Sequence, residues 1–286
     1  GVSDDVTFGG VSILAVGDLY QLPPVGQSQL FSRVSDSYAQ LYRSGSLWVD
    51  EFEMIELDQI MRQRGDERFS QLLCRVRTNE CTTEDLEVLK SREITPNSPN
   101  YPSYVLHVYR LNTDVDARNK LMLDTSAPEN EQYIIKASDS IGGQTTHIDL
   151  STLSEKRSET GGLHSVLKLA IGARVMLTAN VDVADGLVNG ARGEVVHIVT
   201  SPGNEGVTTV LVVFDNQVGL RAVESSPYRS RFPNAVSLAK HEVMFLARGK
   251  KGSEVTRLQF PLTLAWATTI HKVQGLTLDE IGDDMK

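Results

Sequence analysis

The chain has 286 residues, of which 40% are hydrophobic and 23% are charged, and its formal net charge is −9. This length suits one large domain or two to three small globular domains, and no apolar run approaches the roughly 20 residues needed to cross a bilayer. The first residues lack the basic and apolar parts of a signal peptide, and Cys74 and Cys81 show no metal-ligand spacing, so we expect an intracellular protein with free thiols and without a disulfide framework.

The first predicted element is a strand over residues 11–16. Its nearly continuous apolar letters, VSILAV, are typical of a strand buried on both faces of a parallel sheet. Ligand chemistry in such sheets lies at the carboxyl ends of the strands, where Asp18 and Gln21 stand. Spacing alone favours an ordinary loop in which these two side chains tie down backbone. The alternative is an amide that meets a phosphate oxygen or its attacking water.

Two helices are predicted within residues 66–92. Asp66 is placed to cap the first, and Thr82 or Thr83 to begin the second. The apolar residues of the first helix follow the spacing of one helix face: Phe69, Leu72, Leu73 and Val76. Farther on, residues 104–108 predict a strand, and residues 113–116 have the spacing of a capping box that starts a helix.

Closely spaced β-type runs follow from residue 167. They read LKLAIGARVMLTANV, ARGEVVHIV and TTVLVVFD, and turn signals separate them: Asp185-Gly186, Asn189-Gly190 and Pro202-Gly203. These runs predict a small barrel of about 90 residues, inserted before the α/β pattern resumes at Phe260. The apolar letters FPLTLAWA then predict a buried strand with Trp266 in the core, and the polar cluster TTIHKVQGLT comes directly after it.

Charge is unevenly distributed along the chain. Residues 221–257 hold eight basic and three acidic residues, a local charge of +5 in a chain whose total is −9. A nucleic-acid groove needs local positive potential, so the overall sign does not decide against one. A solvated basic face is the alternative.

The N-terminal part resembles motif III of the Pif-type (petite integration frequency) ATP-dependent DNA helicases, the RecD-like members of superfamily 1B, over the letters FGGVSILAVGDLYQLPPV. The matched positions are Gly17, Asp18, Gln21, Leu22, Pro23, Pro24 and Val25. Four further segments match in family order: 56–63 as motif IV, 111–119 as a strand-to-helix segment, parts of 172–193 as the inserted SH3-like domain, and TIHKVQG at 269–275 as motif V.

The resemblance implies an α/β fold of RecA-like helicase lobes, the P-loop NTPase fold, with an incomplete first lobe and an inserted SH3-like β-barrel. Residues 1–52 would be the C-terminal remnant of lobe 1A, 53–160 the first part of lobe 2A, 161–258 the inserted 2B barrel, and 259–286 the return of lobe 2A with motif V. The sheet of the first lobe would lack its phosphate-loop strand, which would leave the apolar faces around residues 11–16 uncovered.

The resemblance also assigns roles. Gln21 would sense the γ-phosphate, and Arg62 would be the arginine finger that stabilises charge on the transferred phosphoryl group. Nucleotide-binding positions would be Gly17, Asp18, Gln63, Lys272, Gln274 and Gly275. Contacts to DNA phosphates would come from Thr269, His271, Lys168, Arg174, Lys250 and Lys251. Without the family context, Arg62 is better interpreted as a helix-start arginine paired with an acid, and His271 could be a satisfied core histidine.

Some parts of such a motor are missing from the sequence. There is no phosphate loop of the form G-x-x-x-x-G-K-[ST], and its nearest approach is Gly249-Lys250-Lys251. In the family the magnesium-holding Asp-Glu pair precedes motif III, so Asp50-Glu51 is interpreted as a surface connector. Motif VI would follow the last residue. We therefore expect ATP and Mg²⁺ to be cofactors of a full-length parent whose ligating residues are absent from this chain.

The function expected of the parent is ATP-driven 5′-to-3′ translocation on single-stranded DNA and unwinding of duplex DNA in repair, recombination or telomere maintenance. Its partners would be single-stranded DNA or DNA forks and no membrane, and it would be a monomer in the nucleus or mitochondrion of a eukaryote. This chain alone is expected to be inactive, with Gln21, Arg62 and the turn 271–275 in one cleft. The alternative is a catalytically dead DNA- or protein-binding module derived from such a helicase.

Overall fold

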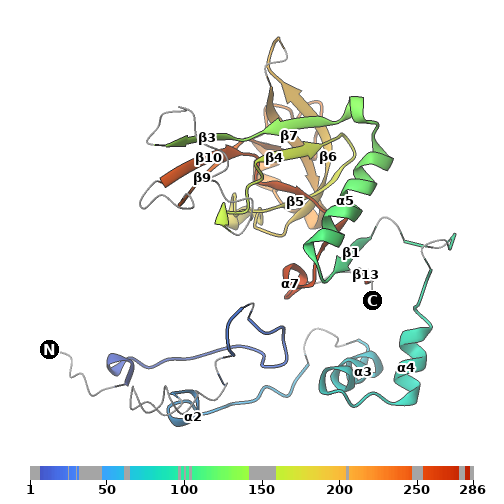
Figure 1. The fold of residues 1–286 in the computed structure, drawn as a ribbon, viewed down its shortest axis with the longest axis vertical. Coiled ribbons are helices and arrows are strands. Elements are labelled where there is room, and N and C mark those ends of the chain that lie inside the picture. The colour runs from blue at the N-terminus through green and yellow to red at the C-terminus, as the bar shows by residue number, and fades with distance from the viewer. Residues whose placement is uncertain are drawn as a thin grey trace. The chain divides into compact units, whose positions relative to one another are not determined.

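The computed structural model describes residues 7–24, 26–29, 31, 47–60, 65–95, 98–99, 101–102, 105–141, 159–203, 206–246, 254–276 and 281–283. They fall into two compact units, residues 1–101 and 102–286, each of which is described by itself (Figure 1). None of the helices within these ranges has the length and apolar character that a membrane crossing requires.

The first unit contains the short helix η1 (Thr7–Gly10) and the helices α2 (Leu47–Asp50), α3 (Glu67–Thr78) and α4 (Thr83–Lys90). The predicted cap of α3 is confirmed, because the Asp66 carboxylate accepts a hydrogen bond of 2.9 Å from the Phe69 backbone N–H. Of the two candidate starts of α4, Thr82 is the cap. Its hydroxyl accepts from the Asp85 N–H at 3.2 Å, and the Asp85 carboxylate accepts from the Thr82 N–H at 2.9 Å.

The same Asp85 carboxylate joins α4 to α3. Arg75 donates to it through Nε and Nη2, both at 2.7 Å. The Arg75 guanidinium, followed by the Thr82 backbone N–H, holds the pKa of Asp85 well below its usual range. One buried carboxylate thus caps α4 and also links it to α3. Both helices expose apolar side chains: Phe69 of α3 is 45% exposed and Leu86 of α4 is 46% exposed.

We expect Asp85→Asn to lower the melting temperature of α3 and α4 by a few degrees, measured by far-UV circular dichroism. A group whose folded-state pKa is depressed contributes stability above its unfolded pKa, about 3.9 for Asp, and this contribution is lost as pH falls through the folded value. The difference between variant and wild type should therefore persist at neutral pH and vanish in strong acid. Glu84→Gln is the control, since Arg68–Glu84 is an exposed pair at 3.6 Å; an equal effect there would contradict the prediction.

The strand predicted at residues 11–16 is wrong in this structure. Residues 11–18 form no regular element, and Leu14 and Val16 are 88% and 85% exposed. An isolated strand leaves its backbone groups unpaired, so an apolar run becomes a strand only where neighbouring strands accept it. Every described strand lies in the second unit. The exposure does match the expectation that these apolar residues would be uncovered.

A small parallel sheet organises one end of the second unit. Its order is β12 (Ala267–Thr269), β1 (Leu106–Tyr109), β13 (Ile281–Asp283), with β1 in the centre. Helix α5 (Asn112–Ser126) contacts both β1 and β12. The capping box predicted at residues 113–116 is wrong, because the helix begins at Asn112 after an uncapped Leu111, which places Thr113 already inside the first turn.

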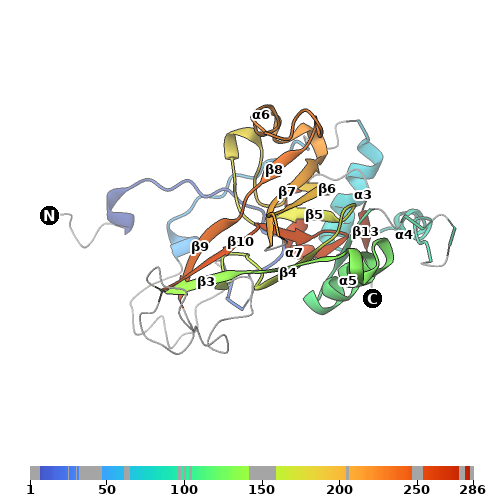
Figure 2. The ribbon, with the colours of Figure 1, turned by 90° about the horizontal axis from the view of Figure 1, so that it is seen from above.

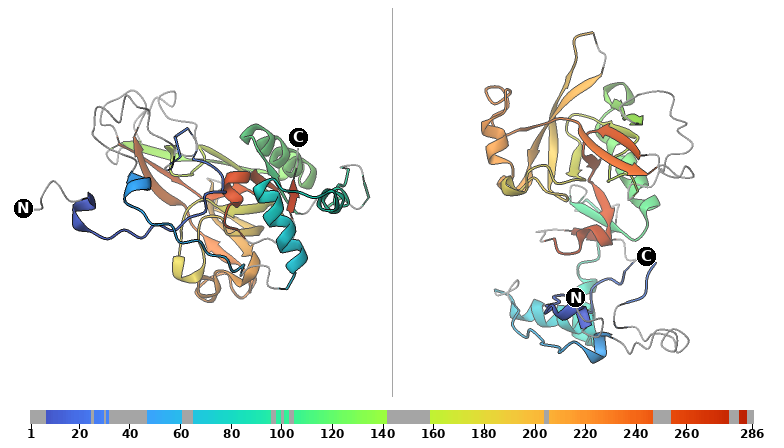
Figure 3. Two further views of the ribbon diagram at one scale, coloured as in Figure 1. Left: turned by 90° about the horizontal axis from the view of Figure 1, so that it is seen from below. Right: turned by 90° about the vertical axis from the view of Figure 1, so that its left-hand side faces the viewer.

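The predicted β-type runs form strands of two further sheets, and a third sheet is built from other segments. The five-stranded sheet has the order β11 (Leu262–Leu264), β5 (Arg174–Leu177), β6 (Arg192–Thr200), β7 (Val207–Phe214), β8 (Val236–Leu238). A three-stranded sheet has the order β3 (Ser138–Ile141), β10 (Glu254–Gln259), β9 (His241–Leu246), and its strands lie side by side in Figure 2. A two-stranded sheet pairs β2 (Tyr133–Lys136) with β4 (Val166–Leu169). The hairpin of β6 and β7 extends beyond the rest of its sheet (Figure 3). No closed barrel is formed by the described strands, whose five-stranded sheet ends at β11 and β8.

Short helices complete the second unit: η2 (Glu129–Glu131), η5 (Val183–Asp185), η6 (Asp215–Gln217), α6 (Leu220–Glu224) and α7 (Ile270–Val273). One hydrophobic cluster joins α5, the five-stranded sheet and the segment from Phe260 to Trp266. The prediction that Trp266 is a core residue is confirmed by its 5% exposure. The pairings of β11 with β5 and of β3 with β10 cross the predicted domain limits at 160 and 258, and those limits stay predictions.

Candidate nucleotide and nucleic-acid site

The polar cluster TIHKVQG forms a turn at the carboxyl end of β12. Thr269 is the last residue of the strand and the N-cap of α7, and it pairs in parallel register with Tyr109 of β1. Carboxyl ends of parallel strands are where ligand sites of open α/β sheets lie. The predicted motif V thus lies at the edge of the sheet where such chemistry is expected.

Within this turn, His271, Lys272 and Gln274 are exposed, whereas Thr269 is only 8% exposed. The core-histidine alternative is therefore wrong for His271. The buried histidine of this sheet is His107 of β1, whose Nδ1 lies 2.9 Å from the Val105 carbonyl oxygen. Burial, followed by the nearby Arg118 charge, lowers the pKa of His107, which favours a neutral ring.

Gly275 closes the turn with a φ of +82°. A β-carbon built there would have no neighbour within 4 Å, so crowding does not require a glycine at this position. The left-handed backbone conformation does favour glycine, because residues with a β-carbon rarely adopt it. The space around Gly275 is open, as the predicted approach of a ligand to this backbone would require.

The first unit contains the other described part of the predicted site. Asp18 accepts hydrogen bonds from the Tyr20 backbone N–H at 3.0 Å and from Arg77, and Gln21 Nε2 donates to it at 3.4 Å. The Arg77 guanidinium also lies 4.8 Å from the centre of the Tyr20 ring. In this structure Asp18 therefore ties down its own loop, and Arg77 is a neighbour of motif III that sequence reasoning missed.

The remaining predicted residues divide into two groups. Arg62, Gln63, Lys250 and Lys251 lie outside the described residues. Gly17 is exposed in the first unit, while the turn 271–275 belongs to the second. The convergence of Gln21, Arg62 and this turn in a single cleft stays a prediction.

Two predicted DNA contacts lie on strands of the second unit. Lys168 points out from β4 and is exposed. Arg174 of β5 is held by Asp215 in a two-pronged ion pair, with Nη1–Oδ1 at 3.2 Å and Nη2–Oδ2 at 2.6 Å. Arg192 is a neighbouring cation: burial and the charge of Arg174 lower its pKa, while Asp215 opposes the shift. The only sequence signal for Arg192 was its place in the segment matched to the SH3-like domain.

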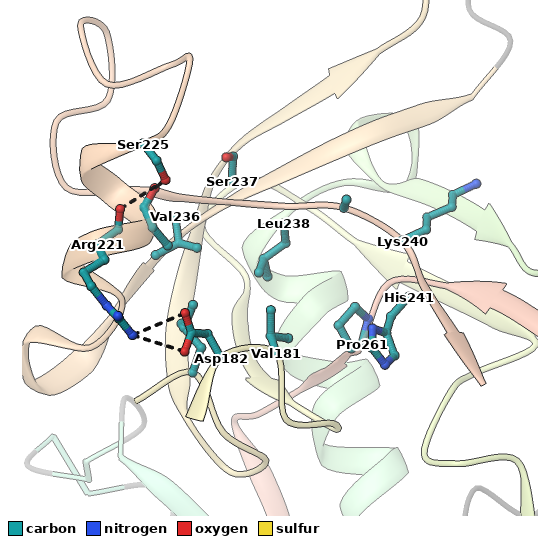
Figure 4. A pocket seen from close by; sticks show the side chains of 13 residues that line it. Val181, Asp182, Arg221, Ser225, Val236, Ser237, Leu238, Lys240, His241 and Pro261 are labelled. Atoms are coloured by element: carbon teal, nitrogen blue, oxygen red, sulfur yellow. Dashed lines mark hydrogen bonds and ion pairs between the residues drawn. The ribbon is translucent and has the colours of Figure 1, made fainter. Parts of the chain in front are cut away.

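A separate groove lies between the residues that flank η5, helix α6 and the β8–β9 connection (Figure 4). Its volume is about 620 Å³, and Arg221 faces Asp182 on one side while Lys240 and His241 lie on the other. Asp182 and Asp185 pair with Arg221 at 3.3 and 3.8 Å, so little free positive charge faces the groove from that side. None of the predicted site residues lines it.

Part of the predicted basic stretch is also unavailable to a ligand. Arg257 is 2% exposed and binds Asp139 through Nε and Nη2, both at 2.8 Å. Arg221 is paired with Asp182 and Asp185. The local charge of +5 therefore overstates the cations that this segment can offer to a phosphate backbone.

Among the described residues there is no group of three or more His, Cys, Asp or Glu side chains that could hold a metal ion. For ATP, the exposed turn 271–275 offers polar groups and an open glycine, yet the sequence has no phosphate loop. Nucleotide binding by this turn stays a prediction.

Comparison with protein families matches residues 161–198 to the model described as DNA helicase Pif1, 2B domain. The chain is 33% identical over 275 residues to the ATP-dependent DNA helicase PIF1 of Danio rerio, covering 95% of this chain and 36% of the relative. It is 28% identical over 278 residues to the Pif1 helicase of Bdellovibrio bacteriovorus, covering 97% of this chain and 53% of that relative. The chain thus spans about a third to a half of the relatives' length.

Solved structures agree. The Candida albicans Pif1 helicase matches 98% of this chain and 59% of its own with a TM-score of 0.68 at 24% identity, which shows the fold. A Bacteroides Pif1 helicase in complex with ADP-AlF3 and single-stranded DNA matches 98% of this chain and 57% of its own, with a TM-score of 0.60 and 26% identity. The chain therefore has the RecA-like helicase fold of these neighbours.

Proposed function

Because this chain belongs to the Pif1 helicase family, we propose that it is the part of an ATP-dependent DNA helicase that grips single-stranded DNA and responds to the state of a bound nucleotide. The observation that carries this proposal is the turn 269–275. It combines the family's motif V with a place at the carboxyl end of a parallel strand and with exposed donors.

Within the turn we assign different partners to different side chains. His271 is exposed and would donate to a DNA phosphate, while Thr269, mostly covered, would contribute at the point where strand becomes helix. Lys272, Gln274 and Gly275 would face the nucleotide. In the first unit Gln21 would sense the γ-phosphate, and Arg62 would act as the arginine finger.

In the whole protein these groups would couple ATP hydrolysis, with Mg²⁺, to 5′-to-3′ movement along single-stranded DNA and to strand separation. The strands between residues 161 and 258 would form the SH3-like 2B barrel and press on the DNA track, with Lys168 and Arg174 as phosphate contacts. Its match to the 2B domain model supports this assignment for residues 161–198.

The chain of 286 residues should bind a labelled single-stranded oligonucleotide without turning over ATP, because it contains cationic and polar contacts but no phosphate loop. Fluorescence anisotropy at several salt concentrations measures the first property, and release of inorganic phosphate measures the second. Absence of oligonucleotide binding at low salt would contradict the DNA role, and ATP turnover above the buffer rate would contradict the inactivity.

The variant Lys250→Glu/Lys251→Glu locates the track in the same assay. If both lysines contact phosphates, the slope of log affinity against log salt should fall by roughly two. Lys120→Glu, an exposed lysine on α5, is the matched control. Equal slopes for all three proteins would remove Lys250 and Lys251 from the DNA path.

A further inference from the structure

A single buried amide lies in the middle of the apolar face of α5. The buried residues of this helix are Val115, Asn119 and Leu123, at the i, i+4, i+8 spacing of one face. Asn119 is 5% exposed between two aliphatic side chains. Because a buried amide is costly unless its donors and acceptor are satisfied, its partners on the neighbouring element show what it does there.

Those partners are the backbone of β12, two residues before the turn. Asn119 Nδ2 donates to the Ala267 carbonyl oxygen at 3.0 Å, and the Ala267 N–H donates to Asn119 Oδ1 at 2.8 Å. A longer bond of 3.4 Å runs from Nδ2 to the Leu264 carbonyl oxygen. The side chain thus donates one hydrogen bond to Ala267 and accepts one from it, as the backbone of a neighbouring strand would.

The sheet explains why β12 needs this partner. On its other side β12 pairs with β1, where the His107 N–H donates to the Trp266 carbonyl oxygen at 2.9 Å. Backbone groups of successive strand residues point to alternate sides, so the N–H and C=O of Ala267 face away from β1. In the described sheet β12 is an edge strand, and Asn119 satisfies the groups that this edge would leave unpaired.

We infer that Asn119 is a positioning residue for the turn 269–275. Its amide fits Ala267 in one register only, because donor and acceptor must both meet their partners. This contact fixes the end of β12 against α5, and Thr269 follows two residues later as the N-cap of α7. The consequence for DNA binding rests on the proposed function, whereas the consequence for the turn itself does not.

Asn119→Asp tests the inference with Gln259→Glu as its matched control. Gln259 is also a fully buried amide, whose Nε2 donates to the Ile135 and His164 carbonyl oxygens at 3.0 and 3.3 Å and whose Oε1 accepts from the Phe260 N–H at 3.0 Å. Each substitution replaces one NH₂ group by an oxygen. These hydrogen bonds of Gln259 reach residues 135, 164 and 260 and not β12, so the two variants share the chemical change and differ in its place.

In Asn119→Asp we expect the backbone amides of residues 269–275 to exchange hydrogen about tenfold faster than in the wild type. We also expect the affinity for the oligonucleotide to fall about tenfold. In Gln259→Glu, the exchange rate and the affinity should both stay within about twofold of the wild-type values. Unchanged exchange at 269–275 in Asn119→Asp, or equal acceleration in both variants, would overturn the inference. If Asn119→Asp does not fold by circular dichroism, Asn119→Ser, which is smaller and uncharged, takes its place with the same expected direction.

The hydrogen-exchange and affinity measurements together separate this inference from the proposed function. Faster exchange of the turn with unchanged oligonucleotide affinity would uphold the positioning by Asn119 and contradict the DNA contact assigned to the turn. A wild-type chain that binds no oligonucleotide would contradict the proposed function, and the exchange measurement would still decide on Asn119.

Discussion

Gly275→Val is expected to weaken binding of a single-stranded oligonucleotide by about ten- to a hundredfold. Gly275 has a φ of +82°, a conformation that a β-branched residue adopts only at a cost of about 1–3 kcal/mol. The turn would relieve this strain by changing its backbone path. His271 and Lys272 would then no longer present their side chains in the arrangement that the phosphate and nucleotide contacts need. Fluorescence anisotropy with the variant and the wild-type chain measures the effect.

A second glycine separates strain from function. Gly203, in the turn between β6 and β7, has a φ of +91°, and as at Gly275 a β-carbon there would have no neighbour within 4 Å. Gly203→Val therefore introduces a similar backbone strain in a turn that carries none of the proposed ligand contacts. Circular dichroism should show similar losses of stability in both variants, and only Gly275→Val should lose affinity. A comparable loss of affinity in Gly203→Val would mean that general destabilisation explains the result.

Local signals predicted the elements whose stability is local. The Asp66 and Thr82 caps, the glycine turns and the β-type runs after residue 167 all appear where the sequence places them. Each depends on hydrogen bonds or turns between residues a few positions apart. Trp266 was placed in the core because its neighbours are apolar, and this also is a local property.

Contacts between distant residues could not be predicted in this way. Asn119 and Ala267 are 148 residues apart, and no periodicity links an amide on a helix to one backbone position of a strand. The strand predicted at residues 11–16 failed for the same reason. An apolar run specifies that a segment can be buried, but the strands that would pair with it must be supplied by another part of the fold. Likewise, from the sequence alone Arg257 counts among the cations that could contact a phosphate backbone. Its partner Asp139 lies 118 residues away, so no local pattern shows that the charge of Arg257 is already paired.

Arg257→Met should destabilise the second unit by about 3–5 kcal/mol, because it leaves the Asp139 carboxylate buried without its two guanidinium donors. The side chains of Arg257 and Asp139 are 2% and 8% exposed. Arg257 Nη1 also donates to the Leu163 carbonyl oxygen at 3.3 Å, so this one guanidinium joins β10 to β3 and to the segment that leads into β4. Chemical denaturation followed by circular dichroism measures the change in the free energy of unfolding.

Two further variants decide whether the buried charge is the cause. Arg257→Met combined with Asp139→Leu removes both charges, so it should recover much of the stability that Arg257→Met loses alone. Arg68→Met breaks the exposed pair Arg68–Glu84, whose side chains are 79% and 80% exposed, and should cost at most about 1 kcal/mol. If the double variant is as unstable as the single one, loss of packing around Phe245, whose ring centre lies 5.2 Å from the Arg257 guanidinium, must explain the effect in place of the uncompensated carboxylate. That outcome would still identify Arg257 as a structural residue and would leave the phosphate contacts of this segment to other cations.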